Sequence, residues 1–223
     1  MQPQADPFIV PVCSEEIEIL YQDESILLIN KPGNLLTLSG KHPLNKDSVH
    51  FRLVKDFPTA TVVHRLDFGT SGILVVALNK AVNGNIGKQF QDRSVNKQYM
   101  AMLDGHLPED EGCISYPITK DKLHFPLQKI CFETGKNAQS HYQVVERLEE
   151  PKTTRVIFKP VSGRTHQLRI HSREIGHPIL GCDLYADDAA YFKAKRLMLH
   201  ASHIEFDHPV TGKKVKGYCP CPF

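Results

Sequence analysis

Near Asn96 the spacing of apolar residues changes, and this change limits the folds that the chain can adopt. Beyond that point the segments KQYMAML, SHYQVV and TTRVIF alternate between apolar and polar residues, with polar connections such as Glu149 to Lys152 between them. A period of two is typical of half-buried strands, because successive strand side chains point to opposite faces. We therefore expect an antiparallel sheet in this part of the chain.

The residues before Asn96 predict short strands mixed with helices. IEILYQDESILLINKP holds two apolar runs around a polar turn, which is typical of a hairpin. Ser48 can cap a short helix that Pro58 ends, and Lys80 to Arg93 predicts a second helix in spite of two glycines. GILVVAL, from Gly72, has the length and composition of a buried strand.

Two further helices are expected near the C-terminus, and the last segments predict another hairpin. Thr165 is the predicted N-cap of a helix over HQLRIHSREIG that Gly176 ends, and Asp187 to Lys195 predicts a shorter one. RLMLHASHIEF and KKVKGY flank the turn-forming HPVTG. The fold class that follows is α+β: a mixed, largely antiparallel sheet with packed helices.

Length and composition suit one self-contained domain. The chain has 223 residues, of which 41% are apolar, so we expect a single catalytic domain over residues 1–223. It has no apolar run of bilayer length, and its start lacks the features of a signal peptide, so a cytoplasmic protein is expected. The six cysteines follow no framework spacing, which favours reduced thiols.

Net charge does not by itself suggest a polyanionic partner. Lys plus Arg, 27, exceeds Asp plus Glu, 25, by only two. Binding a polyanion depends on local clusters of positive charge, although such clusters are more often plain solvated surface. The candidate clusters are Arg164, Arg169 and Arg173, then Lys193, Lys195 and Arg196, then Lys213, Lys214 and Lys216.

Asp67 is the carboxylate with the most informative surroundings. It lies in HRLDFGTSG, a loop rich in Gly, Thr and Ser that leads into the buried strand. Such a loop can hold a carboxylate rigidly for chemistry. The structural alternative is an Asx-turn, in which Asp67 accepts hydrogen bonds from the amides of Thr70 and Ser71.

Other readings of these motifs fail on their spacing. HRLDFG mimics both kinase motifs, HRD and DFG, but one aspartate cannot serve as catalytic base and metal ligand, and the kinase glycine-rich loop is missing. GNIGKQ lacks the first glycine and the final Ser or Thr of a phosphate-binding loop. His200 and His203 fall on opposite faces of a strand, and with His208, Cys219 and Cys221 they fit no zinc template.

Three motifs in order, VHRLDFGTSGILVVALNK, NKQYMA and SGRTHQLRIH, resemble the RluA family of pseudouridine synthases. The similarity runs from about Ile26 to the C-terminus and implies the catalytic fold of that family, without a separate domain of the ribosomal S4 type. It implies that Asp67 is the catalytic aspartate, Tyr99 the active-site tyrosine and Arg169 the arginine that pairs with the aspartate. It also implies RNA contacts by Arg65, which fills the stack after base flipping, and by Arg164.

The chemistry of this family explains the residue types. Isomerising uridine to pseudouridine breaks the N1 to C1′ bond and rejoins the base through C5, with no redox change, so no cofactor is expected. A carboxylate can act as nucleophile or stabilise an oxocarbenium-like centre, and an adjacent guanidinium keeps it ionised. Without the resemblance, Tyr99 would be interpreted as a packing residue, Arg169 as a surface charge and Arg65 as a salt-bridge partner. His64, His166 and His171 are expected only to orient loops.

The resemblance also implies a structured RNA substrate. Its closest branch implies a uridine in the tRNA anticodon loop, position 32, and one in large-subunit ribosomal RNA. A related synthase acting on another tRNA or rRNA uridine would carry the same motifs. A non-catalytic RNA-binding or ribosome-assembly factor is the alternative of another class, and the intact Asp67, Tyr99 and Arg169 argue against it.

Overall fold

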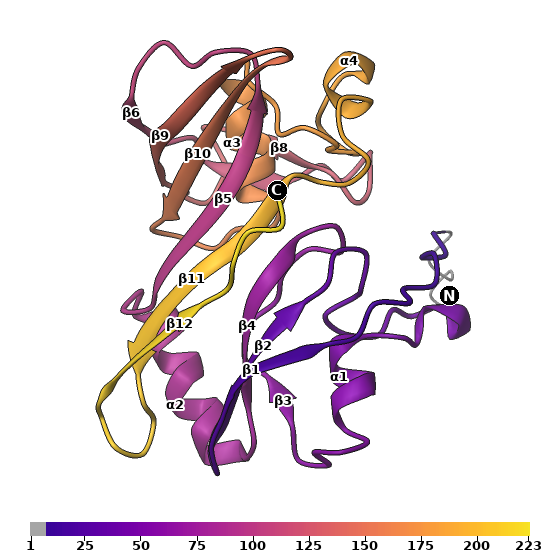
Figure 1. Cartoon of the computed structure of the whole chain (residues 1–223), viewed down its shortest axis with the longest axis vertical. Coiled ribbons are helices and arrows are strands. Elements are labelled where there is room, and N and C mark those ends of the chain that lie inside the picture. The colour runs from indigo at the N-terminus through magenta and orange to yellow at the C-terminus, as the bar shows by residue number, and fades with distance from the viewer. Residues whose placement is uncertain (1–7) are drawn as a thin grey trace. The chain divides into compact units, whose positions relative to one another are not determined.

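A computed structural model describes residues 8–223, which form two compact units (Figure 1). Unit 1 contains the chain as far as Val95 together with His203–Pro220. Unit 2 contains Asn96–Ser202 and Cys221–Phe223. Strands pair antiparallel in both units and short helices accompany them, which confirms the predicted α+β class.

Unit 1 is organised around β4, a strand whose seven residues are all buried. This burial on both faces explains why its sequence is a continuous apolar run rather than an alternating one. The predicted hairpin forms from β1 and β2, and β2 and the short β3 both pair with β4. The strands are β1 (Glu18–Gln22), β2 (Ile26–Lys31), β3 (Thr61–Val62), β4 (Ser71–Ala77), β11 (Leu199–Asp207, whose first four residues belong to unit 2) and β12 (Lys214–Tyr218).

Both α-helices of unit 1 begin at a side-chain cap, and the one at Ser48 was predicted. The Ser48 hydroxyl accepts the Phe51 amide at 3.1 Å and starts α1 (Val49–Leu53). The Asn79 side chain accepts the Val82 amide at 2.9 Å and starts α2 (Lys80–Gln91). GNIGKQ lies inside α2, so it is helix and not a phosphate-binding loop. A single 3-10 turn, η1 (Pro43–Asn45), precedes α1.

Unit 2 contains the antiparallel sheet that the alternating segments predicted. β10 pairs with β5 on one side and with β9 on the other, and β9 also pairs with β6. A separate two-stranded ladder joins β7 and β8. The strands are β5 (Asn96–Asp104), β6 (Glu111–Ile114), β7 (Ile118–Lys120), β8 (Gln128–Ile130), β9 (Ser140–Glu149) and β10 (Lys152–Pro160).

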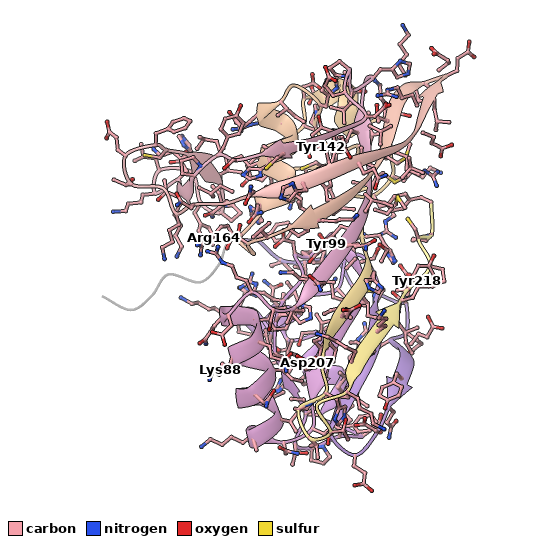
Figure 2. The ribbon with its side chains drawn as sticks, turned by 90° about the vertical axis from the view of Figure 1, so that its left-hand side faces the viewer. Lys88, Tyr99, Tyr142, Arg164, Asp207 and Tyr218 are labelled. Carbon is pink, nitrogen blue, oxygen red and sulfur yellow. The ribbon has the colours of Figure 1, made fainter. Side chains whose placement is uncertain are left out.

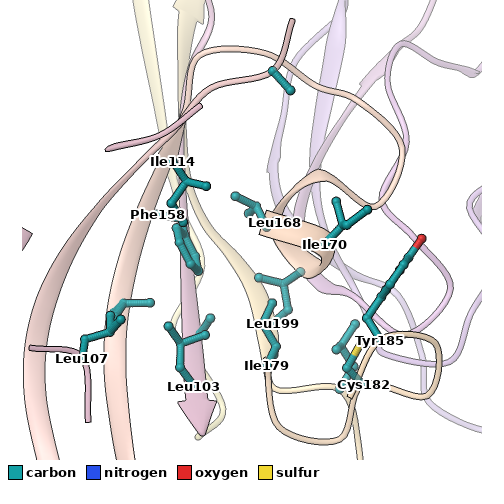
Figure 3. Close-up of a cluster of buried hydrophobic side chains, with 14 of the residues drawn as sticks. Leu103, Leu107, Ile114, Phe158, Leu168, Ile170, Ile179, Cys182, Tyr185 and Leu199 are labelled. Carbon is teal, nitrogen blue, oxygen red and sulfur yellow. The ribbon is translucent and has the colours of Figure 1, made fainter. Parts of the chain in front are cut away.

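One apolar core joins this sheet to α3 (Gln167–Glu174), as Figure 3 shows. Phe158 of β10 and Leu103 of β5 are fully buried in it, and Leu168 and Ile170 reach it from the helix. Six consecutive residues of α3, Gln167 to Ser172, are buried, which fixes the helix in unit 2. A last short helix, α4 (Asp188–Tyr191), is capped by the Asp187 side chain and covers less than the predicted Asp187 to Lys195.

The predicted N-cap of α3 is wrong. His166, not Thr165, precedes the helix, in the left-handed region at φ 56°, and no side chain caps it. The reason is that the Gln167 side chain folds back and accepts the Arg164 amide at 3.0 Å, so the entry to the helix is organised from inside it. The predicted stop is confirmed, since Gly176 has φ 82° and its amide donates to the Arg173 carbonyl.

Two global properties can be read from the described residues. None of the helices in residues 8–223 has the length and apolar character needed to span a bilayer. All six cysteines are free thiols. That units 1 and 2 together form a single catalytic domain stays a prediction.

Candidate active site

Asp67 lies in a braced loop of unit 1, between β3 and β4. Its carbonyl accepts the Thr70 amide at 3.1 Å, which closes a tight turn through Phe68 and Gly69. In the Asx-turn, the structural alternative, the side chain of Asp67 would accept this amide, whereas the main-chain carbonyl accepts it here. On the other side, the Thr37 hydroxyl donates to the Leu66 carbonyl at 2.7 Å and fixes the residue before Asp67.

Lys31, at the end of β2, anchors the same turn from beneath. Its side chain is fully buried, and its ammonium donates to three carbonyls: Pro32 at 2.9 Å, Leu35 at 2.7 Å and Phe68 at 3.2 Å. An ammonium has three donors, so these carbonyls compensate for the desolvation of its charge. The bond to Phe68 fixes the carbonyl of the residue that follows Asp67.

His64 holds the beginning of the loop against β4 and α2. Its Nε2 accepts the Val75 amide at 3.1 Å, so this nitrogen carries no proton. Its ring stacks on Phe90 with centroids 4.6 Å apart. The expectation that His64 orients the loop is confirmed. Arg65, one residue further, is exposed.

In unit 2 a polar network shapes the loop that carries Arg164. Ser162 donates to the Gln167 side-chain oxygen at 2.8 Å, and the Gln167 amide donates to the Gln139 carbonyl at 2.9 Å. The half-buried Arg164 donates through Nε to the Asn137 carbonyl at 3.2 Å. This bond positions its side chain beside the loop between β8 and β9.

His171 extends this network beneath α3. Its Nδ1 lies 3.0 Å from the Ser140 hydroxyl and its Nε2 lies 3.1 Å from the Tyr116 carbonyl. A carbonyl can only accept, so Nε2 carries the proton and Nδ1 accepts from Ser140. Burial lowers the pKa of His171, so the ring is neutral at pH 7. With the bond between His166 Nδ1 and the Tyr185 hydroxyl at 2.8 Å, the orienting roles expected of both histidines are confirmed.

Arg169 is buried in α3 with 4% of its surface exposed, so it does not belong to a surface cluster as its charge had suggested. Its guanidinium donates to Asp183 and, through Nε, to the Cys182 sulfur at 3.2 Å. The guanidinium carbon also lies 5.5 Å from the centre of the Tyr185 ring. These contacts fix the orientation of Arg169. Its pairing with Asp67 stays a prediction.

Tyr99 is half-buried on β5 opposite Phe158 of β10 and packs against the unit 2 core. Figure 2 shows Tyr99 on its strand and Arg164 on the loop that precedes α3. Lys97 lies two residues before Tyr99, on the same face of the strand, and burial lowers its pKa. A lysine side chain therefore shares that face with the tyrosine.

Several of the suggested basic residues are neutralised within their own unit. Lys193 pairs with Asp104, Lys214 with Asp207 at 2.9 Å and Lys216 with Glu205 at 3.5 Å. The remaining suggested lysines, Lys195 and Lys213, are exposed. Among the residues that the structure describes, no cluster of His, Cys, Asp and Glu is arranged to hold a metal ion.

Comparison with known proteins assigns these features to one family. Residues 25–174, which include the Asp67 loop, β5 and α3, match the family model described as RNA pseudouridylate synthase. The chain belongs to the RNA pseudouridylate synthase family. The enzyme is therefore an isomerase that acts on uridine in RNA.

Relatives of known sequence support this assignment over most of the chain. The dual-specificity RNA pseudouridine synthase RluA of Yersinia pestis is 47% identical over 205 residues, covering 92% of this chain and 99% of the relative. The protein of the same name from Escherichia coli K12 is 45% identical, covering 92% and 93%. Among solved structures, human RNA pseudouridylate synthase domain containing 1 has a TM-score of 0.80 and 32% identity, covering 96% of this chain and 86% of that one.

Two positions in this synthase escaped the sequence analysis. Lys31 reads as an ordinary lysine before a proline, and only the folded chain shows its ammonium beneath the Asp67 turn. Lys97 carried a signal, because the period of two places it on the same face as Tyr99. Asp67 and Arg65 belong to unit 1, whereas Tyr99, Arg164 and Arg169 belong to unit 2. Their joint action stays a prediction.

Proposed function

We propose that this synthase is a dual-specificity enzyme that modifies position 32 in the tRNA anticodon loop and one uridine in large-subunit ribosomal RNA. Two relatives that are 47% and 45% identical over 92% of the chain bear the dual-specificity name, which supports the proposal. The proposed tRNA target lies in a loop, and unstacked loop bases are the usual objects of specific RNA recognition. The reaction needs no cofactor, and both RNAs are found in the cytoplasm.

Asp67 is the catalytic carboxylate in this proposal, and the bracing of its loop is the observation that supports it. Lys31 and Thr37 fix the main chain on either side of Asp67, at Phe68 and Leu66. A nucleophile held in one geometry loses little entropy on the way to the transition state. The N1 to C1′ bond breaks, a C5 to C1′ bond forms, C5 loses a proton and N1 gains one, so atoms and electrons balance. Attack at C6, attack at C1′ and a glycal intermediate all satisfy this balance.

The other site residues take roles that match their surroundings. Tyr99 stacks on the uracil and offers an ionisable hydroxyl near the base. Arg169 keeps Asp67 ionised, and its buried, fixed guanidinium suits that task better than a mobile surface cation would. Arg65 is exposed beside the loop and enters the RNA stack when the target base leaves it. Arg164 contacts the phosphate backbone.

Mapping pseudouridine in total RNA tests the proposal. Cells that lack the protein are compared with cells that regain the parent chain or Asp67→Asn. We expect pseudouridine to disappear at tRNA position 32 and at one large-subunit rRNA site, and to return with the parent chain only. Loss at a different uridine would replace the proposed substrate with that of another synthase of the family. An unchanged map would favour the non-catalytic RNA-binding factor.

A further inference from the structure

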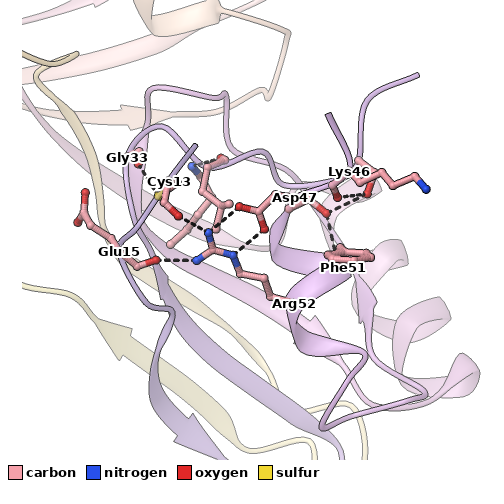
Figure 4. Close-up of polar contacts among 11 residues, drawn as sticks. Cys13, Glu15, Gly33, Lys46, Asp47, Phe51 and Arg52 are labelled. Carbon is pink, nitrogen blue, oxygen red and sulfur yellow. Dashed lines mark hydrogen bonds and ion pairs between the residues drawn. The ribbon is translucent and has the colours of Figure 1, made fainter. Parts of the chain in front are cut away.

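Residues 8–16 cross the surface of unit 1 without regular secondary structure before β1 begins, and we call this segment the strap. Few extended terminal segments are well ordered unless something holds them. Side chains from two neighbouring elements hold the strap here. Figure 4 shows one of the two attachments, centred on Arg52 of α1.

Arg52 binds the strap through its main chain. Its guanidinium donates to the Cys13 carbonyl and the Glu15 carbonyl, each at 2.6 Å. Two further bonds, at 2.7 and 2.6 Å, join it to both carboxylate oxygens of Asp47, which keeps the guanidinium in one orientation. The Cys13 thiol adds a weak bond to the Gly33 carbonyl at 3.7 Å. Main-chain carbonyls are bound, so the attachment fixes the path of the strap and not one side chain.

Asn45 of η1 makes the second attachment, nearer the start of the strap. Its side-chain amide donates to the Phe8 carbonyl at 2.7 Å and its oxygen accepts the Val10 amide at 2.9 Å. The Asn45 side chain thus binds a main-chain carbonyl and the amide two residues later, as a neighbouring β-strand would. Asn45 is itself 2% exposed, and its carbonyl accepts the Gly40 amide at 2.8 Å, so the attachment point is rigid.

The attachments bring the ring of Phe8 to the loop that carries Asp67. Phe8 and Phe68 form an edge-to-face pair with centroids 6.1 Å apart and an interplanar angle of 80°. Phe68 directly follows Asp67, and its carbonyl is the one that Lys31 binds. Lys31 thus holds the main chain of Phe68, while Phe8 contacts its side chain. Phe8 is about half exposed, so core packing does not account for its position.

We propose that the strap is a positioning element of the synthase, and that Phe8 sets the geometry of the Asp67 carboxylate through Phe68. The inference rests on the proposed catalytic role of Asp67. With Phe8 in contact, the side chain of Phe68 is supported as well as its carbonyl, which Lys31 binds. Without that contact the ring of Phe68 can change rotamer, and the adjacent carboxylate moves with the turn. Displacing a reacting group by about an ångström can cost roughly a hundredfold in rate.

The test measures single-turnover rate at saturating RNA, dissociation constant and thermal unfolding midpoint for Phe8→Ala and Phe8→Tyr. The matched control is Phe192→Ala, which removes an exposed phenylalanine that also makes an edge-to-face pair, with Tyr191. We expect Phe8→Ala to lower the saturated rate about tenfold while affinity and unfolding midpoint stay within error. Phe8→Tyr keeps the ring pair and should react at the parent rate. Phe192→Ala should leave the rate, the dissociation constant and the unfolding midpoint unchanged.

Each other outcome overturns the inference in a recognisable way. A loss of affinity at an unchanged saturated rate would make Phe8 an RNA contact. An unchanged rate for Phe8→Ala, together with an inactive Asp67→Asn, would remove the role of the strap and leave the proposed function standing. An active Asp67→Asn would remove both. A fall in rate that merely follows a lower unfolding midpoint, and that Phe8→Tyr does not rescue, would reduce Phe8 to a structural residue.

Discussion

At the scale of single residues, the fully buried ammonium of Lys31 ties stability to catalysis. Lys31→Met leaves the carbonyls of Pro32, Leu35 and Phe68 without this donor, and each such loss in the interior costs about 1 to 3 kcal/mol. We expect urea denaturation to show a loss of at least about 3 kcal/mol in the free energy of unfolding, and the folded fraction to react at least about tenfold more slowly. The exposed Lys41→Met is the control. Equal stability of the two variants would mean that the carbonyls find other donors.

Tyr99 separates packing from chemistry at the same scale. Tyr99→Phe keeps the ring against the unit 2 core and removes only the hydroxyl. If the hydroxyl takes part in proton transfer, the single-turnover rate should fall by about a hundredfold or more while the RNA dissociation constant changes less than threefold. Fluorescence titration and single-turnover assays on the same RNA measure the two. Losses of equal size would instead identify a binding residue.

At the scale of elements, α3 makes the stability of unit 2 depend on pH. Burial lowers the pKa of His171 below its ordinary value of about 6.5, so the unfolded chain takes up a proton more readily than the folded one. Above a pH of about 6.5, His171 is neutral in both the folded and the unfolded chain, and the free energy of unfolding is unaffected. Below it the unfolded chain takes up the proton first, so the free energy of unfolding falls. We expect the urea midpoint to fall between about pH 7.5 and 5.5. His171→Gln should flatten this dependence, and an equally steep one would assign it to another group.

The alternation of side chains explains why the strands after Asn96 could be predicted from the sequence. β9 and β10 alternate in burial along much of their length, which leaves a period of two in the sequence, whereas Ala101, Met102 and Leu103 of β5 are all buried. The start of α3 could not be predicted, because it depends on Gln167 folding back to the loop before it, a contact that no local cap pattern encodes. Caps and side-chain periods can be predicted from local sequence, whereas the start of α3 depends on a hydrogen bond between the helix and the loop before it.

Some residues of the candidate site could be predicted from the sequence and others could not. Asp67, Tyr99 and Arg169 came from motifs that resemble a family, and the chain belongs to that family. Lys31 escaped because its role depends on a carbonyl 37 residues further along the chain. The strap could not be predicted either, because its short sequence carries no periodic signal and its attachments come from Asn45 and Arg52.

At the scale of the whole molecule, a net charge of only +2 has to coexist with RNA binding. Lys193, Lys214 and Lys216 are already paired with carboxylates, so fewer cations of the suggested basic clusters remain for phosphates. Four contacts to a single-stranded loop would lower the affinity roughly 50-fold between about 50 and 200 mM salt. Binding measured across this range should show that decrease, and Arg164→Ala should make it shallower by about one contact. An affinity that does not change with salt would contradict binding through the RNA phosphates.

Catalysis by this synthase is attributed to Asp67, and single-turnover pseudouridine formation by Asp67→Asn tests that attribution. The amide keeps the size of the side chain and removes the anionic nucleophile. The variant should fold with the unfolding midpoint of the parent, bind RNA with the same dissociation constant and form no pseudouridine. Turnover above about one part in a thousand of the parent rate, with deamidation excluded by mass spectrometry, would contradict a nucleophilic Asp67.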